Sequence, residues 1–174
     1  MIEFLRKRRS VRKFTKQKIS DNDITVLKES LLRSPSSRNK RPWEFIFVDA
    51  EELIGQLSES KQHGSQFLNN APLAVVICGD ETITDVWVED CSIAATILQL
   101  TVENLSLGSC WIQIRNRMHN DEVSSENFIQ NLLNIPKNIR VESIIAIGHP
   151  DEEKIPVQES ELNFNQIKRN RYSK

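Results

Sequence analysis

The side chains best suited to chemistry gather near the start of the chain. Arg8, Arg9 and Arg12 flank Ser10, within a stretch ending at Lys18 that holds eight basic side chains and one acidic one. Guanidinium groups offer forked donors to phosphate oxygens, and a serine hydroxyl adds a further hydrogen bond. The stretch is therefore a candidate anion site. Taken alone, such a charge run is more often a solvated basic helix, and it also fits a nucleic-acid-binding module.

Two further motifs lie along the chain. Residues 34–43 read Ser-Pro-Ser-Ser-Arg-Asn-Lys-Arg-Pro-Trp, and residues 107–112 read Leu-Gly-Ser-Cys-Trp-Ile. Proline and small polar residues dominate turns for conformational reasons, so the first motif by itself predicts an ordinary surface loop. Trp111 and Ile112 lie at the end of an apolar strand, and we expect them in the core rather than at a ligand.

The remaining polar candidates give no metal site. His63, His119 and His149 lack the spacing of metal ligands, and the three cysteines form no Cys-x-x-Cys pair. Unpaired cysteines of this kind favour a reducing, cytoplasmic environment. Asp90 falls within a predicted buried helix, where its charge requires a partner such as an arginine.

Hydrophobic periodicity predicts the elements that position these residues. We expect an α+β order with helices over about 21–33, 51–60, 84–107 and 125–133, and strands over 45–48, 73–78, 109–112 and 141–147. Ser20 with Asp23 resembles a capping box for the first helix. The third helix is apolar almost all round, which predicts a central buried position, and Gly108 is its expected stop. Strand 73–78 is apolar throughout, as in a central strand covered on both faces, and Gly79-Asp80 is expected to end it.

Length and composition limit the number of domains and the classes of partner. At 174 residues and 39% hydrophobic content, residues 1–174 should form one domain. A net charge of -1 favours neither nucleic acid nor a membrane as a partner, and no apolar run reaches the roughly 20 residues that span a bilayer. Residues 155–174 are too polar for a core of their own, which predicts an extended arm packed on another surface, such as a partner subunit.

Together the motifs resemble the FMN-dependent nitroreductase family. The resemblance rests on Arg8-Arg9-Ser10-Val11-Arg12, the Pro-Ser-Ser-x-Asn-x-x-Pro-Trp loop and the Gly-Ser-Cys-Trp-Ile strand, in the family's order. Residues 88–95 and 146–154 extend it over nearly the whole chain. It implies a nitroreductase-like fold: a mixed, mainly antiparallel sheet wrapped by helices, in a homodimer with a domain-crossing C-terminal arm and FMN bound tightly and non-covalently at the interface.

The resemblance also implies a role for each motif. Arg8, Arg9 and Ser10 would contact the phosphate and ribityl end of FMN. Arg12 would lie near N1 and O2 of the ring, where a fixed cation stabilises the negative charge that reduction places there. The other subunit would contact the same FMN through its loop, with Pro35, Ser36, Ser37 and Asn39.

The family's chain then passes the flavin where Gln113 and Ile114 fall. A main-chain N–H there, assigned to Gln113, would hydrogen-bond flavin N5, the atom that receives hydride. Arg12 and Gln113 are thus the predicted catalytic contacts. Lys168 and Arg169 align loosely with terminal phosphate contacts, although a solvated basic tail explains them equally well.

Four positions depart from the family's pattern. Arg41 stands where glutamine is frequent, and Ile97 replaces an asparagine. Ile114 occupies a place usually given to glycine or alanine, which would narrow the pocket above the flavin, while Arg115 could favour an anionic substrate or the phosphate of NADPH.

The leading interpretation is a reductase that uses NADH or NADPH to reduce nitroaromatic, quinone or similar small acceptors by a ping-pong hydride transfer. A specialised relative, such as a reductive dehalogenase or a flavin-destroying synthase, ranks lower because the sequence shows no extra lid segment. A non-catalytic flavin-binding redox sensor is the alternative outside the enzymes.

Overall fold

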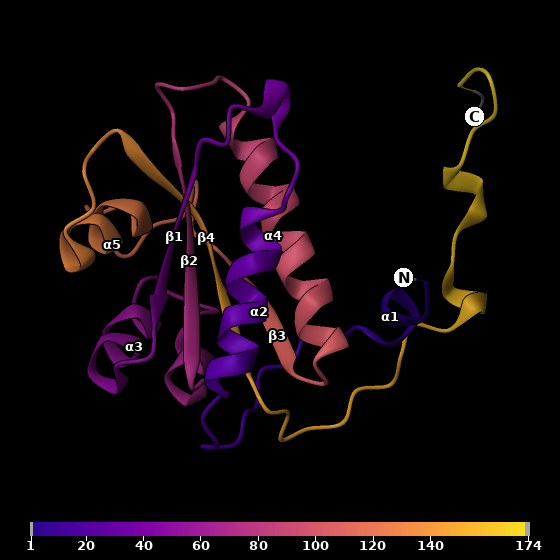
Figure 1. Cartoon of the computed structure of the whole chain (residues 1–174), viewed down its shortest axis with the longest axis horizontal. Helices are drawn as coiled ribbons and strands as arrows, with labels where there is room; N and C mark the ends of the chain where they lie inside the picture. The colour runs from indigo at the N-terminus through magenta and orange to yellow at the C-terminus, as the bar shows by residue number, and fades with distance from the viewer. Residues whose placement is uncertain (1, 173–174) are drawn as a thin grey trace.

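The computed structural model describes residues 2–172 as a four-stranded sheet between two helical layers (Figure 1). The strands are β1 (Trp43–Val48), β2 (Leu73–Asp80), β3 (Gly108–Gln113) and β4 (Ile139–Gly148), in the order β1-β2-β4-β3. All three ladders between them are antiparallel. The fold class inferred from the sequence, a mainly antiparallel sheet wrapped by helices, is confirmed.

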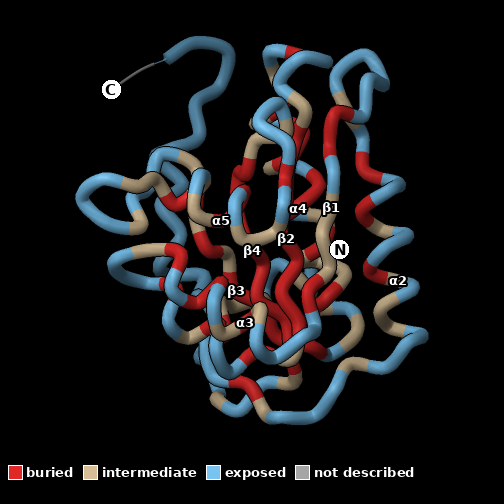
Figure 2. The backbone as a smooth tube through the Cα atoms, turned by 90° about the vertical axis from the view of Figure 1, so that its left-hand side faces the viewer, coloured by how far each residue is buried: buried red, intermediate tan, exposed pale blue. Residues whose placement is uncertain are grey.

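The core forms because β2 and most of β4 are buried and are covered by helices on both faces (Figure 2). Side chains of β2 alternate between two clusters, as the period of a strand requires. Ala74 and Val76 join the cluster under α3 (Glu51–Ser58) and α5 (Ser125–Leu133). Val75 and Ile77 join the cluster under α2 (Asp21–Leu32) and α4 (Trp87–Asn104). The predicted central strand is therefore confirmed, although it continues through Asp80.

The four predicted helices are all present. Ser20 caps α2 by accepting a hydrogen bond from the N–H of Asp23, as the sequence indicated. One detail was wrong: Gly108 does not end α4. That helix closes at Asn104, and Ser106 adopts the left-handed backbone conformation (φ 58°) that turns the chain toward β3. Gly108 is instead the first residue of the strand.

Both ends of the chain leave this body on the same side (Figure 1). The short helix α1 (Ile2–Lys7) lies against α4. Residues 153–172 are exposed throughout and carry two single-turn helices, Glu159–Glu161 and Phe164–Gln166. The last two residues of the predicted arm, 173 and 174, lie outside the described residues, as does residue 1. Among residues 2–172, no helix combines the length and the apolar character needed to cross a membrane.

Candidate functional site

The predicted anion-binding segment, residues 8–12, runs along the outer edge of the sheet beside β3. Ser10 forms a parallel bridge with Ser109, and the N–H of Val11 donates to the carbonyl oxygen of Ser109 over 2.9 Å. Gly108 permits this close approach, because a Cβ built there would lie 2.9 Å from the Cβ of Val11. The spacing of the two sequence motifs therefore reflects direct packing of one on the other.

Successive side chains of this extended segment point to opposite sides, so Arg8, Ser10 and Arg12 share one side. Arg8, Ser10 and Arg12 all act on the buried thiol of Cys110. Burial raises the pKa of that thiol, whereas the charges of Arg12 and Arg8 and the hydroxyl of Ser10 work in the opposite direction. Arg8, Ser10 and Arg12 therefore lie near enough to β3 to influence the Cys110 thiol, and Ser10 is bridged to Ser109, the residue before it.

Arg9 is directed elsewhere. It lines a separate groove of about 340 Å³ together with Lys7, Val11 and Lys154. Neighbouring residues of an extended segment point to opposite sides, so Arg9 does not share the cluster formed by Arg8 and Arg12.

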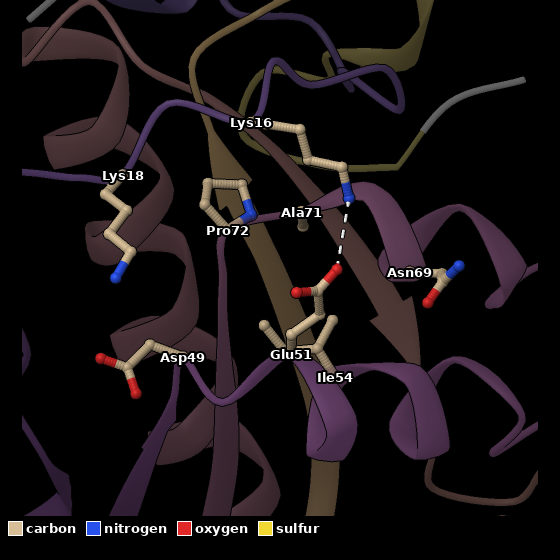
Figure 3. Close-up of a pocket in the computed structure, with 8 residues that line it drawn as sticks. All are labelled: Lys16, Lys18, Asp49, Glu51, Ile54, Asn69, Ala71 and Pro72. Atoms are coloured by element: carbon tan, nitrogen blue, oxygen red, sulfur yellow. Dashed lines mark ion pairs between the residues drawn. The ribbon is translucent and has the colours of Figure 1, made fainter.

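The later lysines of the basic run belong to a third environment (Figure 3). Lys16 and Lys18 line a small pocket beside the start of α3, where the ammonium group of Lys16 lies 4.0 Å from the carboxylate of Glu51 and Lys18 points toward Asp49. Acidic partners thus accompany these two lysines, and the basic run is not a single cationic site.

The second motif forms a loop of unusual backbone geometry between α2 and β1. Three of its residues, Arg38, Asn39 and Arg41, have φ values of 50°, 55° and 49°. Residues other than glycine adopt this left-handed conformation at a cost of roughly 1–2 kcal/mol each, so surrounding contacts must hold the loop. Within it, the Ser36 hydroxyl accepts from the N–H of Arg41, and Asn39 accepts from the Arg41 guanidinium.

Asp90 is a buried contact that helps to fix this loop to the body, together with a 2.8 Å hydrogen bond from Lys40 to the carbonyl oxygen of Ile83. Its side chain is 2% exposed, and its Oδ1 accepts a hydrogen bond of 2.8 Å from the N–H of Ser37. The expected arginine partner was wrong: no side chain among the described residues pairs with this carboxylate, and its Oδ2 is buried without a hydrogen-bond donor. The exposed Pro35 and Asn39 lie in the same loop.

The third motif ends where β3 leaves the sheet. The N–H groups of Ile114 and Arg115 both donate to the carbonyl oxygen of Glu142 on β4, over 3.2 and 3.0 Å. Antiparallel strands alternate between residues that face the neighbouring strand and residues that face away. The carbonyl oxygen of Ser109 points away from β4 and accepts from Val11, whereas the N–H of Ile114 points toward β4. Gln113 alternates in phase with Ser109, so its main-chain N–H also points away from β4.

The side chain of Gln113 is held in place by its neighbours. It accepts a 3.0 Å bond from the indole N–H of Trp111 and donates over 3.1 Å to the carbonyl oxygen of Arg115. Ile112 is buried in the core as expected, while Trp111 is half-buried.

Ile114 does not narrow a pocket, contrary to the expectation from the family's pattern. Its side chain is wholly buried in the cluster under α3 and α5, and its N–H is used by Glu142. The isoleucine at this position therefore contributes to the hydrophobic core. Arg115, in contrast, is half-buried, with its guanidinium 6.0 Å from the ring of Trp87.

Two acidic residues near these motifs had no role in the sequence-based prediction. Burial raises the pKa of Glu142, and hydrogen bonds from Ser143 and Ser92 partly oppose that shift. Glu152 holds the main chain of Arg12 through a 2.7 Å hydrogen bond. Glu152 lay within a motif that carries the family resemblance, but nothing in its type or spacing indicated a contact 140 residues away.

Lys168 and Arg169 are exposed residues of the arm, which lies apart from the body in Figure 1. The ammonium group of Lys168 lies 5.7 Å from the ring of Tyr172, within the arm itself. In the described chain these two residues do not join the other predicted site residues.

Comparison with known proteins places this geometry in a family. The pattern of the Nitroreductase family matches residues 5–62 and 50–149. A protein of Archaeoglobus fulgidus named as an NADH dehydrogenase/NAD(P)H nitroreductase is 36% identical over 162 residues, covering 91% of this chain and 89% of that protein.

The fold agrees with the sequence match. An FMN-dependent nitroreductase from Clostridium difficile R20291 superimposes with a TM-score of 0.97 at 43% identity, covering 99% of this chain and 100% of that one. An iodotyrosine deiodinase from Thermotoga neapolitana is a more distant relative, at 23% identity over 184 residues and 88% of this chain.

Proposed function

Because this chain belongs to the nitroreductase family, we propose that it is an FMN-dependent oxidoreductase that takes hydride from NADH or NADPH and reduces nitroaromatic, quinone or similar small acceptors. The observation that carries the proposal is the arrangement along the free edge of β3. Arg8, Ser10 and Arg12 cluster around Cys110, and Gln113 directs a main-chain N–H outward from the same edge.

These residues fit FMN in both charge and position. Arg8 and Ser10 provide guanidinium and hydroxyl donors for a phosphate or ribityl oxygen. Arg12 provides a fixed cation for the N1–C2=O edge, and Gln113 provides an N–H donor for N5. When bound, FMN supplies the capacity to accept and pass on a hydride, while these groups position it and tune its electronics.

The placement of the loop at residues 35–41 supports the homodimer that we propose. The loop is fixed to Asp90 in the first turn of α4, whereas the groove lined by Arg9 reaches Glu103 near the end of that helix. Thirteen residues of α-helix span roughly 20 Å at 1.5 Å per residue. This separation between the loop and the groove beside segment 8–12 supports an arrangement in which the loop of one copy and the segment of a second copy contact one flavin.

The arm fits the same proposal. Its exposed apolar side chains include Phe164 at 63%, Ile167 at 74% and Tyr172 at 81%. Exposed apolar groups of this density mark a surface that a partner covers, so we assign the arm, residues 155–174, to contacts with the second subunit of a single-domain protomer.

An absorption spectrum tests cofactor, donor and reaction class together. The purified protein should show a flavin band that NADH or NADPH bleaches under anaerobic conditions and that a nitroaromatic or quinone restores. Arg12→Gln should retain FMN but be reduced more slowly. Protein that stays colourless after incubation with FMN would refute the proposal, and an unchanged reduction rate in Arg12→Gln would refute the role of that residue.

The deiodinase relative supplies the second candidate, reductive dehalogenation. Addition of an iodotyrosine to the reduced protein, in place of the nitroaromatic, separates the two. Release of iodide with reoxidation of the flavin would favour dehalogenation, whereas reoxidation by nitroaromatic alone supports the leading proposal. A yellow protein that neither nicotinamide reduces faster than free FMN would indicate a redox sensor.

A further inference from the structure

Glu152 lies where the C-terminal arm leaves the sheet, and its carboxylate is directed back at the start of the chain. One oxygen, Oε1, accepts hydrogen bonds from the main-chain N–H groups of Arg12 over 2.7 Å and Lys13 over 3.3 Å. The other oxygen pairs with the ammonium group of Lys154 over 2.8 Å. Both carboxylate oxygens therefore have partners, and the side chain is only 13% exposed.

Flanking contacts make this junction specific. The N–H of Asp151 donates to the carbonyl oxygen of Lys13, and the N–H of Thr15 donates to that of His149, each over 2.9 Å. Phe14 forms a bridge with Pro150. Residues 12–15 and 149–152 are therefore joined as a short two-stranded connection, with the Glu152 carboxylate at the end where Arg12 begins.

The guanidinium of Arg12, by contrast, forms no hydrogen bond or ion pair with the described residues. It lies 5.8 Å from the centre of the Phe67 ring, a cation–π contact that constrains distance more than direction. The position of this charge is consequently set by its main chain, whose N–H donates a 2.7 Å hydrogen bond to the carboxylate of Glu152.

Glu152 also acts on the same surroundings through its charge. Arg12 and Glu152 shift the pKa of the Cys110 thiol in opposite directions, Arg12 downward and Glu152 upward. The carboxylate is therefore close enough to offset part of the field that Arg12 exerts at the edge of β3.

We propose that Glu152 is a positioning residue for Arg12: its carboxylate fixes the main chain from which the guanidinium reaches the flavin, and its negative charge reduces the potential of that guanidinium at the flavin. This inference rests on the proposed function, because it requires Arg12 to lie at the N1–C2=O edge of FMN. Two substitutions at Glu152 separate the two parts of the proposal.

Glu152→Gln retains an oxygen that can accept from the N–H of Arg12 but removes the charge. The midpoint potential of bound FMN should become more positive, and FMN affinity should stay within about twofold of the parent protein. Glu152→Ala removes the acceptor as well. Its FMN dissociation constant should rise about tenfold, as expected for one charge-assisted hydrogen bond, and reduction by the nicotinamide should slow.

The matched control is Glu153→Gln, which removes an exposed carboxylate one residue away that makes no hydrogen bond or ion pair among the described residues. Thermal unfolding of each variant identifies any that fail to fold, and the isosteric Glu152→Gln keeps the test available if Glu152→Ala does. A potential for Glu152→Gln equal to that of Glu153→Gln would overturn the inference.

A double substitution separates this inference from the proposed function. In an Arg12→Gln background, the rise in the FMN dissociation constant caused by Glu152→Ala should shrink or vanish, because that rise comes from the position of the Arg12 side chain. An undiminished rise would mean that Glu152 acts independently of Arg12, and the positioning role would be rejected. If Arg12→Gln itself changes neither potential nor reduction rate, the flavin role of Arg12 fails before Glu152 is considered.

Discussion

Segment 8–12 and the loop at residues 35–41 are both proposed to contact FMN, but the fold secures them in different ways. The segment lies in an extended conformation against β3, where Gly108 leaves room for Val11 and Glu152 binds its main chain. The loop contains three residues in the left-handed conformation and is fixed to the body by the buried carboxylate of Asp90. The segment depends on close packing, whereas the loop is attached by polar contacts, through the Asp90 carboxylate and a hydrogen bond from the Lys40 ammonium group to the carbonyl oxygen of Ile83.

This difference has a physical reason. A segment that adds to the edge of a sheet gains main-chain hydrogen bonds and buried apolar surface over several residues. An exposed loop has few packing contacts within its own chain, so it requires internal hydrogen bonds and polar anchors to keep one shape. Substitutions should therefore affect the two regions with different severity.

The largest effect is expected at the packing of the segment. Gly108→Ala places a methyl group 2.9 Å from the Cβ of Val11 and must displace the segment from β3. Overpacking of this kind costs about 1–3 kcal/mol, so the free energy of unfolding should fall and FMN affinity should fall with it. Chemical denaturation and a flavin titration measure both quantities.

Gly55→Ala is the matched control for that substitution. A Cβ there meets only the side chain of Asn69 at 3.5 Å, an ordinary contact, and the residue lies within α3. Its stability should equal or exceed that of the parent, because alanine favours helix by roughly 1 kcal/mol over glycine. Equal behaviour of the two variants would show that segment 8–12 does not depend on its fit to Gly108.

The next effect concerns the anchor of the loop. Asp90→Ala leaves the N–H of Ser37 without its acceptor and should cost about 1–3 kcal/mol. FMN affinity should weaken only in the dimer, because the loop contacts the partner's flavin under the proposed function. Denaturation and analytical ultracentrifugation with FMN titration test both points.

Asp90→Asn sharpens the same comparison. Its amide oxygen can still accept from Ser37, and the substitution removes a buried charge whose second oxygen has no donor among the described residues. We expect stability close to that of the parent, or higher. A loss as large as that of Asp90→Ala would mean that the charge itself, and not only the acceptor, holds the loop.

A smaller effect is expected at acidic pH from Glu152, which binds the main chain of segment 8–12. Hydrogen bonds from Arg12 and Lys154 lower the pKa of Glu152 to about 2, below its usual value near 4.3 in an unfolded chain. A lowered pKa in the folded protein contributes stability that is present above the unfolded value and is lost as the pH falls through the folded one. Glu152→Gln should therefore lose less stability than the parent between about pH 4.5 and 2, and parallel acid-unfolding curves would contradict the assignment.

The smallest effect is expected from the backbone of the loop. Arg38→Gly relieves a left-handed φ of 50° but adds freedom to the unfolded chain, so these contributions nearly cancel. The free energy of unfolding should change by less than about 1 kcal/mol. A loss well beyond that value would show that the Arg38 side chain has a role of its own.

Much of the fold was predictable because it depends on local patterns. The helix over 21–33 was indicated by a capping pair and apolar periodicity, and the buried strand over 73–78 by an unbroken apolar run. The end of α4 was mispredicted, because Ser106 adopts a conformation for which glycine is the usual signal. Residue type alone does not show which residue after a helix will adopt this strained backbone conformation.

The candidate site divides in the same way. Residue types and their spacing along the chain determined the family, the basic segment with Ser10 and Arg12, and the loop at residues 35–39, since these depend on local chemistry. Only the tertiary structure separated Arg9 from Arg8 and Arg12, buried Ile114, and paired Glu152 with a residue 140 positions earlier. Those outcomes follow from strand alternation and from how distant segments meet, which the order of residues does not specify.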